Sequence, residues 1–272
     1  MAASAGPADD PAPYARLVLP QTARALALLD EDPASPTCGC FDRAFWHYRT
    51  LVDFPGAGWQ QLVWPLALFD RARPGTPRLR EAVGAGLLWW SRIQHRDGSF
   101  DEWYRNEHSY CPTAFTTAAA CEALLILGAA LPEAVRGAAL AAAERAGAWL
   151  KRRFNPAVMN QNLAAALALW DLAALTGSAR WRRAAEDRYR RVAQAQHAEG
   201  WLPEYGGADF GYATLALDLL AAGDARGAGD LVRDMAGRLA GFLFAVQGAG
   251  PGHAGRLGSR GTAHVFPYGA EH

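Results

Sequence analysis

Long helix-favouring stretches alternate with short breaks along almost the whole chain, and this alternation limits the fold more than any other feature. Strand-type alternation of apolar and polar residues is nearly absent. The sequence therefore predicts an all-α protein, with a disordered N-terminal segment at residues 1–13 followed by a single domain over residues 14–272. The expected helices cover about residues 14–30, 58–72, 77–95, 111–130, 132–153, 158–176, 178–197, 209–222 and 227–247.

The breaks between these stretches are of two kinds that alternate along the chain. Tight breaks, such as 73–77 and 176–180, end one helix with Gly or Pro and start the next. Longer breaks carry most of the polar and aromatic side chains. Helices that follow a long break, such as 158–176, are apolar nearly all round, whereas those that follow a tight break, such as 178–197, have a charged face. This pattern predicts two concentric layers of antiparallel helical hairpins, which is an α/α toroid (barrel), complete or incomplete.

Composition excludes several classes of function. The net charge is zero at pH 7 and 51% of the residues are hydrophobic, which favours a globular core and provides no basic face for nucleic acid. The bias toward Ala, Gly and Arg is typical of a GC-rich bacterial genome. No apolar run reaches membrane-spanning length, and the N-terminus lacks the basic start and apolar stretch of a signal peptide. We therefore expect a cytoplasmic protein without a membrane span or nucleic-acid partner, whose ligand is a small molecule or an oligosaccharide and whose oligomeric state the sequence leaves open.

The cysteines give no sign of a disulfide framework or a metal centre. Cys38, Cys40, Cys111 and Cys121 are too few and too scattered for a stapled fold. Cys38 and Cys40 could begin a metal site, but no second pair of Cys or His follows at ligand spacing. The sequence predicts reduced thiols, no metal site and no cofactor.

A short signature occurs twice in the long breaks. The segment 94–104, QHRDGSFDEWY, matches the segment 196–205, QHAEGWLPEY, and a decayed third copy is expected to begin at Gln247-Gly248. The hairpin between the two clear copies lacks the signature. The resulting hairpin unit of roughly fifty residues is in the range of helical repeat arrays.

The inner helices of such a toroid all begin at the end that holds the long breaks, so residues at these starts should converge on one cavity. A single Asp, Tyr or His at a helix end is usually a cap or a packing residue. Because every start carries acids, amides or phenols, we nevertheless expect a ligand-binding site. The candidate catalytic residues are Asp101, Glu107, His108, Glu204, Tyr205 and Tyr212. The candidate substrate-binding residues are Trp59, Gln60, Gln61, Glu102, Trp103, Tyr110, Asn160, Gln161, Asn162, Trp201, Asp209, Arg260 and His264.

The repeated signature contains the texts Q-x-x-D-G-S-F, from Gln94, and Q-x-x-E-G-W, from Gln196. These texts resemble the QW-type repeat of the squalene cyclase and prenyltransferase toroids. The resemblance implies that Gln and an aromatic ring tie successive hairpins together. The acid-donating DxDD pattern of the class II terpene cyclases does not accompany it, since the nearest text, Asp30-Glu31-Asp32, precedes a proline-rich loop.

Three longer segments also carry a resemblance: RDGSFDEWYRNEHSYCPTAFTTAAACEALLIL, EGWLPEYGGADFGYATLALDLLA and GSRGTAHVFPYGAE. They resemble toroid proteins of the heparinase II/III and alginate lyase type and their uncharacterised relatives, from about residue 40 to residue 272. The resemblance implies a lyase that performs β-elimination on a uronic acid-containing or modified sugar. Such a reaction needs a group that neutralises the sugar carboxylate, a base and an acid. In this sequence the neutralising group would be Asn160, Asn162 or Arg260, the base His108, and the acid Tyr205 or Tyr212.

The residue types leave other functions open. A glycoside hydrolase would use a carboxylate pair, with Asp101, Glu102 or Glu107 facing Glu204 or Asp209, and their separation would decide inversion or retention. An isoprenoid or natural-product cyclase would use the aromatic lining of the cavity to stabilise a cationic intermediate. A non-catalytic toroid would simply bind a glycan.

Overall fold

The computed structural model describes residues 18–48, 52–73, 75–247 and 257–272. This part of the chain is all-helical, as the sequence predicts, with isolated β-bridges but no β-strand. The expected disordered segment at residues 1–13 lies outside the described residues. The elements are η2 (Leu19–Gln21), α2 (Thr22–Leu26), α3 (Arg43–Trp46), η3 (Ala57–Leu62), α4 (Val63–Ala72), α5 (Pro77–Arg92), α6 (Tyr110–Leu127), η4 (Gly128–Ala130), α7 (Glu133–Lys151), α8 (Met159–Thr176), α9 (Ala179–Ala195), α10 (Phe210–Ala225), α11 (Asp230–Ala245) and α12 (Tyr268–Glu271).

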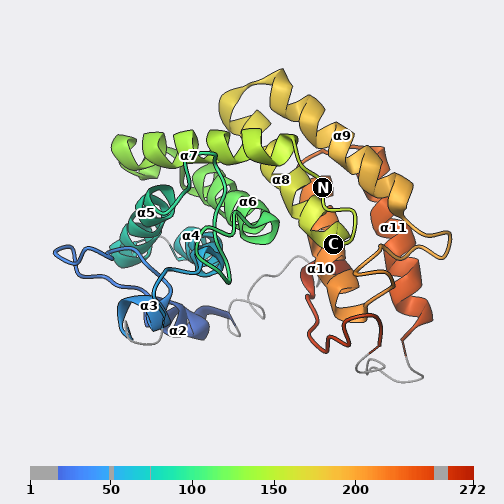
Figure 1. Ribbon diagram of the computed structural model, residues 1–272, viewed down its shortest axis with the longest axis horizontal. Helices are drawn as coiled ribbons and strands as arrows, with labels where there is room; N and C mark the ends of the chain where they lie inside the picture. Colours follow the sequence, from blue (N-terminus) through green and yellow to red (C-terminus); the bar gives the residue numbers. More distant parts are fainter. Residues whose placement is uncertain (1–17, 49–51, 74, 248–256) are drawn as a thin grey trace, which may run out of the picture.

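The longer helices form hairpins that follow one another in chain order, α4–α5, α6–α7, α8–α9 and α10–α11 (Figure 1). The first helices of the hairpins pack in a row, with α6 between α4 and α8, and α8 also against α10. Each second helix lies outside this row, and α5 packs on α7 as α9 packs on α11. The structure therefore has an inner layer of α4, α6, α8 and α10 and an outer layer of α5, α7, α9 and α11.

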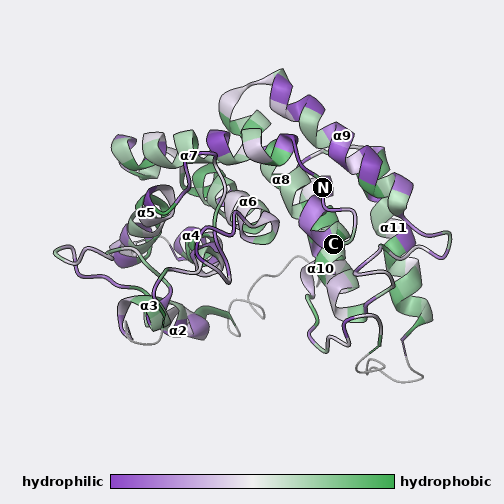
Figure 2. Cartoon of the chain, viewed as in Figure 1, coloured by the Kyte–Doolittle hydropathy of each residue, from purple (hydrophilic) through white to green (hydrophobic). Residues whose placement is uncertain are grey.

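Burial differs between the two layers as the sequence pattern indicates. In α8, every residue from Met159 to Ala173 is buried. In α9, burial is confined to one stripe that includes Trp181, Ala185 and Tyr189, at the spacing of a helix with one apolar face. Figure 2 shows the same contrast, since α8 is mostly hydrophobic and α9 mostly hydrophilic.

Two expected helices are more broken than the sequence suggests, and each contains a proline near its start. Of the helix expected over residues 14–30, the described part contains only η2 and α2, which ends at Leu26. Pro20 lies in the short η2, where its missing amide hydrogen costs no hydrogen bond. The stretch 58–72 begins as η3 and becomes α-helical only at Val63, with Pro65 in the first turn of α4.

The glycines of the repeat let each loop lie directly against the next outer helix. Gly98 and Gly200 have positive φ angles of 98° and 94°. A Cβ atom at Gly98 would overlap the carbonyl oxygen of Arg145 in α7, and one at Gly200 would overlap that of Arg238 in α11. Only glycine combines this backbone conformation with so close an approach.

The glutamines of the repeat tie the same elements together. Gln94 Nε2 donates to the carbonyl of Gly98 (3.0 Å), in its own loop, and to that of Ala142 (2.9 Å), in α7. Gln196 makes the equivalent bonds to its own loop (2.8 Å) and to α11 (3.1 Å). Glutamine thus joins successive hairpins. The decayed copy expected at Gln247-Gly248 runs into residues outside the described part of the chain.

A further copy of this loop lies before α4, at the text Cys-Gly-Cys. Gly39 has a φ of 94°, and a Cβ atom there would overlap the carbonyl oxygen of Ala85 in α5. Gln60 supplies the amide, donating to the carbonyls of Gly39 (3.1 Å) and of α5 (2.9 Å). Burial raises the pKa of the neighbouring Cys40 to about 12. The text is therefore a repeat turn, and within the described residues no group of His, Cys, Asp and Glu is arranged to hold a metal ion.

One helical segment, Tyr110–Ala130, is long and apolar enough to cross a membrane. Its most apolar window is 67% buried inside the protein, because α6 packs against α4, α7 and α8. The sequence expectation that no run reaches spanning length therefore does not hold for this helix. Its position in the inner layer accounts for its composition.

Candidate functional site

A cavity of about 950 Å³ lies between the inner helices and the C-terminal segment 257–272. Side chains from α4, α6, α8 and α10 all line it, so residues near the starts of the inner helices meet in one place. Position along these helices divides the lining into three zones. The mouth contains Gln61, Glu102, Trp103, Cys111, Asn160, Gln161, Tyr205, Tyr212 and Arg260. The belt contains Trp64, Pro65, Leu68, Phe115, Leu215 and Phe266, and the far end contains Arg71, Glu122, Ile126, Asp218, Leu219, Arg226 and Tyr268.

Arg260 is the cation of the mouth. Its guanidinium lies 4.3 Å from the centre of the Tyr205 ring, and its charge lowers the pKa of the Tyr212 phenol. Arg260 forms no ion pair within the part of the chain that the structure describes. Burial raises the pKa of Tyr212, and the charge of Arg260 offsets this only in part, so the phenol keeps its proton at neutral pH.

Asp209 holds Arg260 in place rather than lining the cavity. As the N-cap of α10 it accepts a hydrogen bond from the amide of Tyr212 (3.1 Å). It also accepts from the amide of Arg260 (2.9 Å) and from the hydroxyl of Thr262. Burial alone would raise the pKa of Asp209, but these hydrogen bonds lower it below the usual value. The ionised carboxylate therefore fastens the C-terminal segment to the start of α10.

Glu204 lies buried behind the cavity wall and orients an amide that lines it. Its carboxylate accepts hydrogen bonds from the backbone amide (2.9 Å) and the side-chain amide (2.7 Å) of Asn160. Burial raises the pKa of Glu204 to about 7 despite these bonds. Asn160 and Gln161 both face the cavity, so the start of α8 offers two amide groups to a ligand.

The far end holds a charged cluster that the sequence analysis did not identify. Glu122 of α6 and Asp171 of α8 both pair with Arg226, which follows α10. Glu122 and Arg226 line the cavity, whereas Asp171 is fully buried. Burial raises the pKa of Glu122 to about 7, and burial together with the charge of Glu122 raises that of Asp171 well above its usual value. The pair therefore retains a proton near neutral pH.

The sequence did contain a signal for this cluster. Each inner helix has an acid in its apolar part, at Asp70, Glu122, Asp171 and Asp218. An acid within a helix that is buried nearly all round needs a partner from another element, because an unpaired buried charge is costly. Arg71, Trp64, Phe115 and Phe266 are other cavity residues that the sequence analysis missed.

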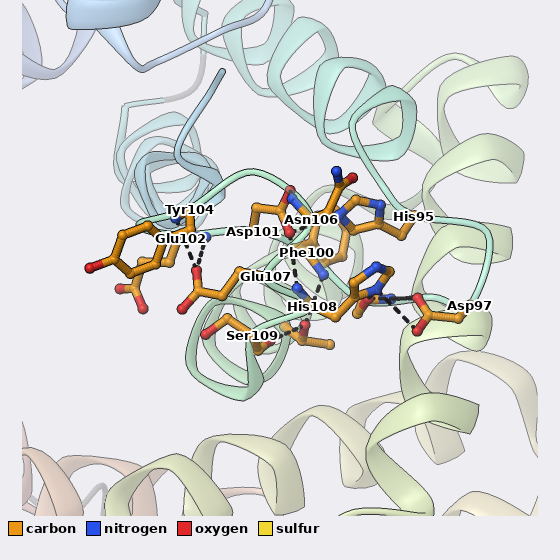
Figure 3. Close-up of polar contacts among 12 residues, drawn as sticks. His95, Asp97, Phe100, Asp101, Glu102, Tyr104, Asn106, Glu107, His108 and Ser109 are labelled. Atoms are coloured by element: carbon orange, nitrogen blue, oxygen red, sulfur yellow. Dashed lines mark hydrogen bonds and ion pairs between the residues drawn. The ribbon is translucent and has the colours of Figure 1, made fainter. Parts of the chain in front are cut away.

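Two acids of the loop between α5 and α6, Asp101 and Glu107, bond to the loop itself (Figure 3). Asp101 accepts hydrogen bonds from the amides of Asn106 (2.8 Å) and His108 (3.0 Å). Glu107 accepts from three successive amides, starting at Glu102, at 2.9, 2.9 and 3.4 Å. Neither Asp101 nor Glu107 lines the cavity. These two candidate catalytic residues stabilise the loop.

His108, the candidate base, also lies outside the cavity lining. Its Nδ1 lies 2.7 Å from the hydroxyl of Ser99 and 3.2 Å from the carboxylate of Asp97. Its ring stacks on His95 with the ring centres 4.1 Å apart, as Figure 3 shows. Its backbone has a positive φ of 52°, which directs the ring to these partners. The structure therefore does not bring His108 together with Tyr212.

Several candidate binding residues have partners away from the cavity. The hydroxyl of Tyr110 donates to Asn162 (2.8 Å), and Arg188 of α9 bonds to both, so all three join the two layers. Trp201 stacks on His197 with the ring centres 4.4 Å apart. The candidates outside the lining are Trp59, Gln60, Asp101, Glu107, His108, Tyr110, Asn162, Trp201, Glu204, Asp209 and His264, and those within it are Gln61, Glu102, Trp103, Asn160, Gln161, Tyr205, Tyr212 and Arg260.

Comparison of the chain with protein-family models, with curated proteins and with solved structures gives no match. The function has to be inferred from the cavity and its side chains.

Proposed function

We propose that the protein is a carbohydrate-active enzyme that performs β-elimination on a uronic acid-containing sugar bound in the cavity. The observation that carries this proposal is Arg260, a guanidinium on the cavity wall that lies over the Tyr205 ring and has no carboxylate partner within the described residues. A cation in this setting favours a ligand with an anionic group, and the planar guanidinium suits a carboxylate. Asn160 and Gln161, which line the same cavity, offer hydrogen bonds to sugar hydroxyls.

The mouth contains the groups that an elimination needs. Arg260 would neutralise the uronate carboxylate, which makes the adjacent ring proton acidic. A base removes that proton, the bond from the neighbouring ring carbon to the leaving oxygen breaks, and a carbon–carbon double bond forms. Tyr212, protonated at neutral pH, would donate a proton to the leaving oxygen. The base would be Tyr205 or Glu102, both of which line the mouth in place of the expected His108.

We also propose that the hairpins belong to an α/α toroid. The two layers of helices and the glutamine ties between successive hairpins support this arrangement. The site would then lie where the inner helices of the toroid begin, which is also where the lyases that the sequence resembles would hold their sugar.

The proposal is tested by incubating the protein with oligouronides and following the absorbance of the unsaturated product. We expect product from the wild type and a loss of about a hundredfold or more in kcat for Arg260→Gln and Tyr212→Phe, because each removes a group that stabilises the transition state. His108→Ala serves as the matched control and should retain activity. Melting temperatures near that of the wild type must accompany both losses. The proposal would be contradicted if every oligouronide failed both to give product and to raise the melting temperature.

A second candidate is a cyclase that acts on an apolar substrate through a cationic intermediate. The belt favours it, because Trp64, Phe115 and Phe266 present aromatic faces between the two polar zones. Burial raises the pKa of Glu122 at the far end to about 7, so its protonated form could supply a proton. Thermal stabilisation by isoprenoid diphosphates, with none by oligouronides, would favour this candidate.

A further inference from the structure

The tip of the loop between α5 and α6 presents two exposed aromatic rings beside the cavity. Trp103 and Tyr104 are 72% and 73% exposed, which is unusual for side chains of this size. Trp103 also lines the mouth, so the exposed surface continues into the cavity. Tyr104 does not line it, and Figure 3 shows its ring at the end of the loop opposite the two stacked histidines.

The backbone that carries these rings is held at several points. The carboxylate of Glu107 accepts hydrogen bonds from the amides of Trp103 (2.9 Å) and Tyr104 (3.4 Å). The amide of Ser109 donates to the carbonyl of Phe100 (2.8 Å), which closes the base of the loop. Groups on a fixed backbone lose little conformational entropy when a ligand binds, so they bind more tightly than the same groups on a mobile loop.

The loop is also held from outside. The amide of Ala57 donates to the carbonyl of Asp101 (3.1 Å), and Arg105 hydrogen-bonds to the carbonyl of Asp53. Since Arg105 and Glu107 already have partners, the exposed side chains at the tip without a hydrogen bond to the described residues are the two rings and the amide of Asn106. The polar residues of this loop therefore support an aromatic surface.

We propose that Trp103 and Tyr104 form a platform that binds a sugar ring of the substrate outside the cavity. This inference rests on the proposed function and narrows its substrate class to a saccharide chain that extends beyond the cavity. Aromatic rings bind the apolar C–H faces of sugar rings, and the polar sugar edges stay in water. Two rings offer far less area than the roughly 800 Å² per partner of a stable protein interface, but they match one or two sugars.

The platform is tested by measuring, by calorimetry, the binding of a disaccharide and of a long oligosaccharide of the same uronic acid. All variants are made in a Tyr212→Phe parent protein, in which turnover is prevented. Because Tyr104 lies outside the cavity lining, Tyr104→Ala should weaken the long ligand about tenfold and leave the disaccharide unchanged. Tyr104→Phe keeps the ring and should bind like the parent. Phe244→Ala is the matched control, since Phe244 is 72% exposed on α11, and it should change neither affinity.

Each other outcome overturns the platform in a recognisable way. Parental affinity of Tyr104→Ala for the long ligand would remove the platform and leave the proposed function intact. Equal weakening of both ligands would show that Tyr104 acts on the cavity instead. If neither the Tyr212→Phe variant nor the wild type binds either ligand, the proposed function is refuted and the platform with it. Loss of a dimer in Tyr104→Ala without a change in saccharide affinity would assign the rings to a second copy of the chain.

Discussion

The loops before α6 and before α10 carry the same repeat signature but use their polar residues differently. In the first loop, Asp101 and Glu107 accept hydrogen bonds from the loop's own amides. In the second, Glu204 holds Asn160 of the neighbouring α8, and Tyr205 reaches the cavity. The comparison indicates that glutamine and glycine anchor each loop, whereas the residues that follow them serve either the loop itself or the site.

The shared anchor should fail in the same way in both loops. Gly98→Ala and Gly200→Ala each place a Cβ atom into a carbonyl group of the next outer helix at a positive φ. We expect each to lower the free energy of unfolding by about 3 kcal/mol or more, measured by chemical denaturation. Gly237→Ala is the control, because Gly237 lies in α11 with open space around it. This substitution should raise the free energy of unfolding by up to about 1 kcal/mol. A loss of stability in only one of these two variants would mean that the two anchors are not equivalent.

One acid from each loop, Glu204 and Asp97, should make stability depend on pH with opposite signs. Burial raises the pKa of Glu204 from 4.5 to about 7, so the folded state binds this proton more tightly than the unfolded state does. Its contribution to stability is lost as the pH rises from about 4.5 to about 7. Burial of Asp97 acts in the same direction, but hydrogen bonds from Ser99 and the charge of His108 outweigh it and lower its pKa from 3.8 to about 2. Its contribution is present above about pH 4 and is lost as the pH falls toward 2.

Unfolding of the wild type, Glu204→Gln and Asp97→Asn across this pH range measures both effects. Glu204→Gln should remove a decline on the order of 3 kcal/mol between about pH 4.5 and 7. Asp97→Asn should reduce the loss of stability in acid, by a smaller amount because Asp97 is partly exposed to solvent. If the free energy of unfolding depended on pH in the same way in both variants, the opposite environments of the two carboxyl groups would be contradicted.

The smallest effects are expected from Asp209 and Asp101, because these two carboxylates hold different segments of the chain. Asp209→Ala removes the cap of α10 and the bonds to the C-terminal segment, so we expect a loss of about 1–2 kcal/mol and faster tryptic cleavage after Arg260. Asp101→Ala should loosen only its own loop and speed cleavage after Arg105. Mass spectrometry of the first tryptic fragments distinguishes the two. Cleavage after Arg260 in both variants would show that the loops are not independent.

The layers of the fold could be predicted because they depend on local composition. The all-round apolar text of α8 and the charged face of α9 follow directly from which layer buries them. The repeat glycines were equally visible, although the copy at Gly39 was missed because its glutamine, Gln60, comes from a later element. Burial pattern and repeat period are properties of short segments, and the sequence displays both.

The site could be predicted only in part, because its geometry depends on contacts between distant segments. Arg260, Tyr205 and Tyr212 were expected near one another, and the structure brings them together. His108 has the chemistry of a base, but a positive φ and the bond from its amide to Asp101 turn it toward its own loop. The sign of a backbone angle and the partner of one carboxylate cannot be read from residue types.

The carboxyl pair at the far end has a thermodynamic consequence for any ligand that reaches it. Glu122 lines the cavity and has a pKa of about 7, so it is partly protonated in a neutral solution. A ligand that displaces water from Glu122 or brings charge near it changes this occupancy, and protons pass between protein and buffer as the ligand binds. The heat of binding will then depend on the ionisation enthalpy of the buffer, and loss of this dependence in Glu122→Gln would assign it to the far end rather than to Glu204.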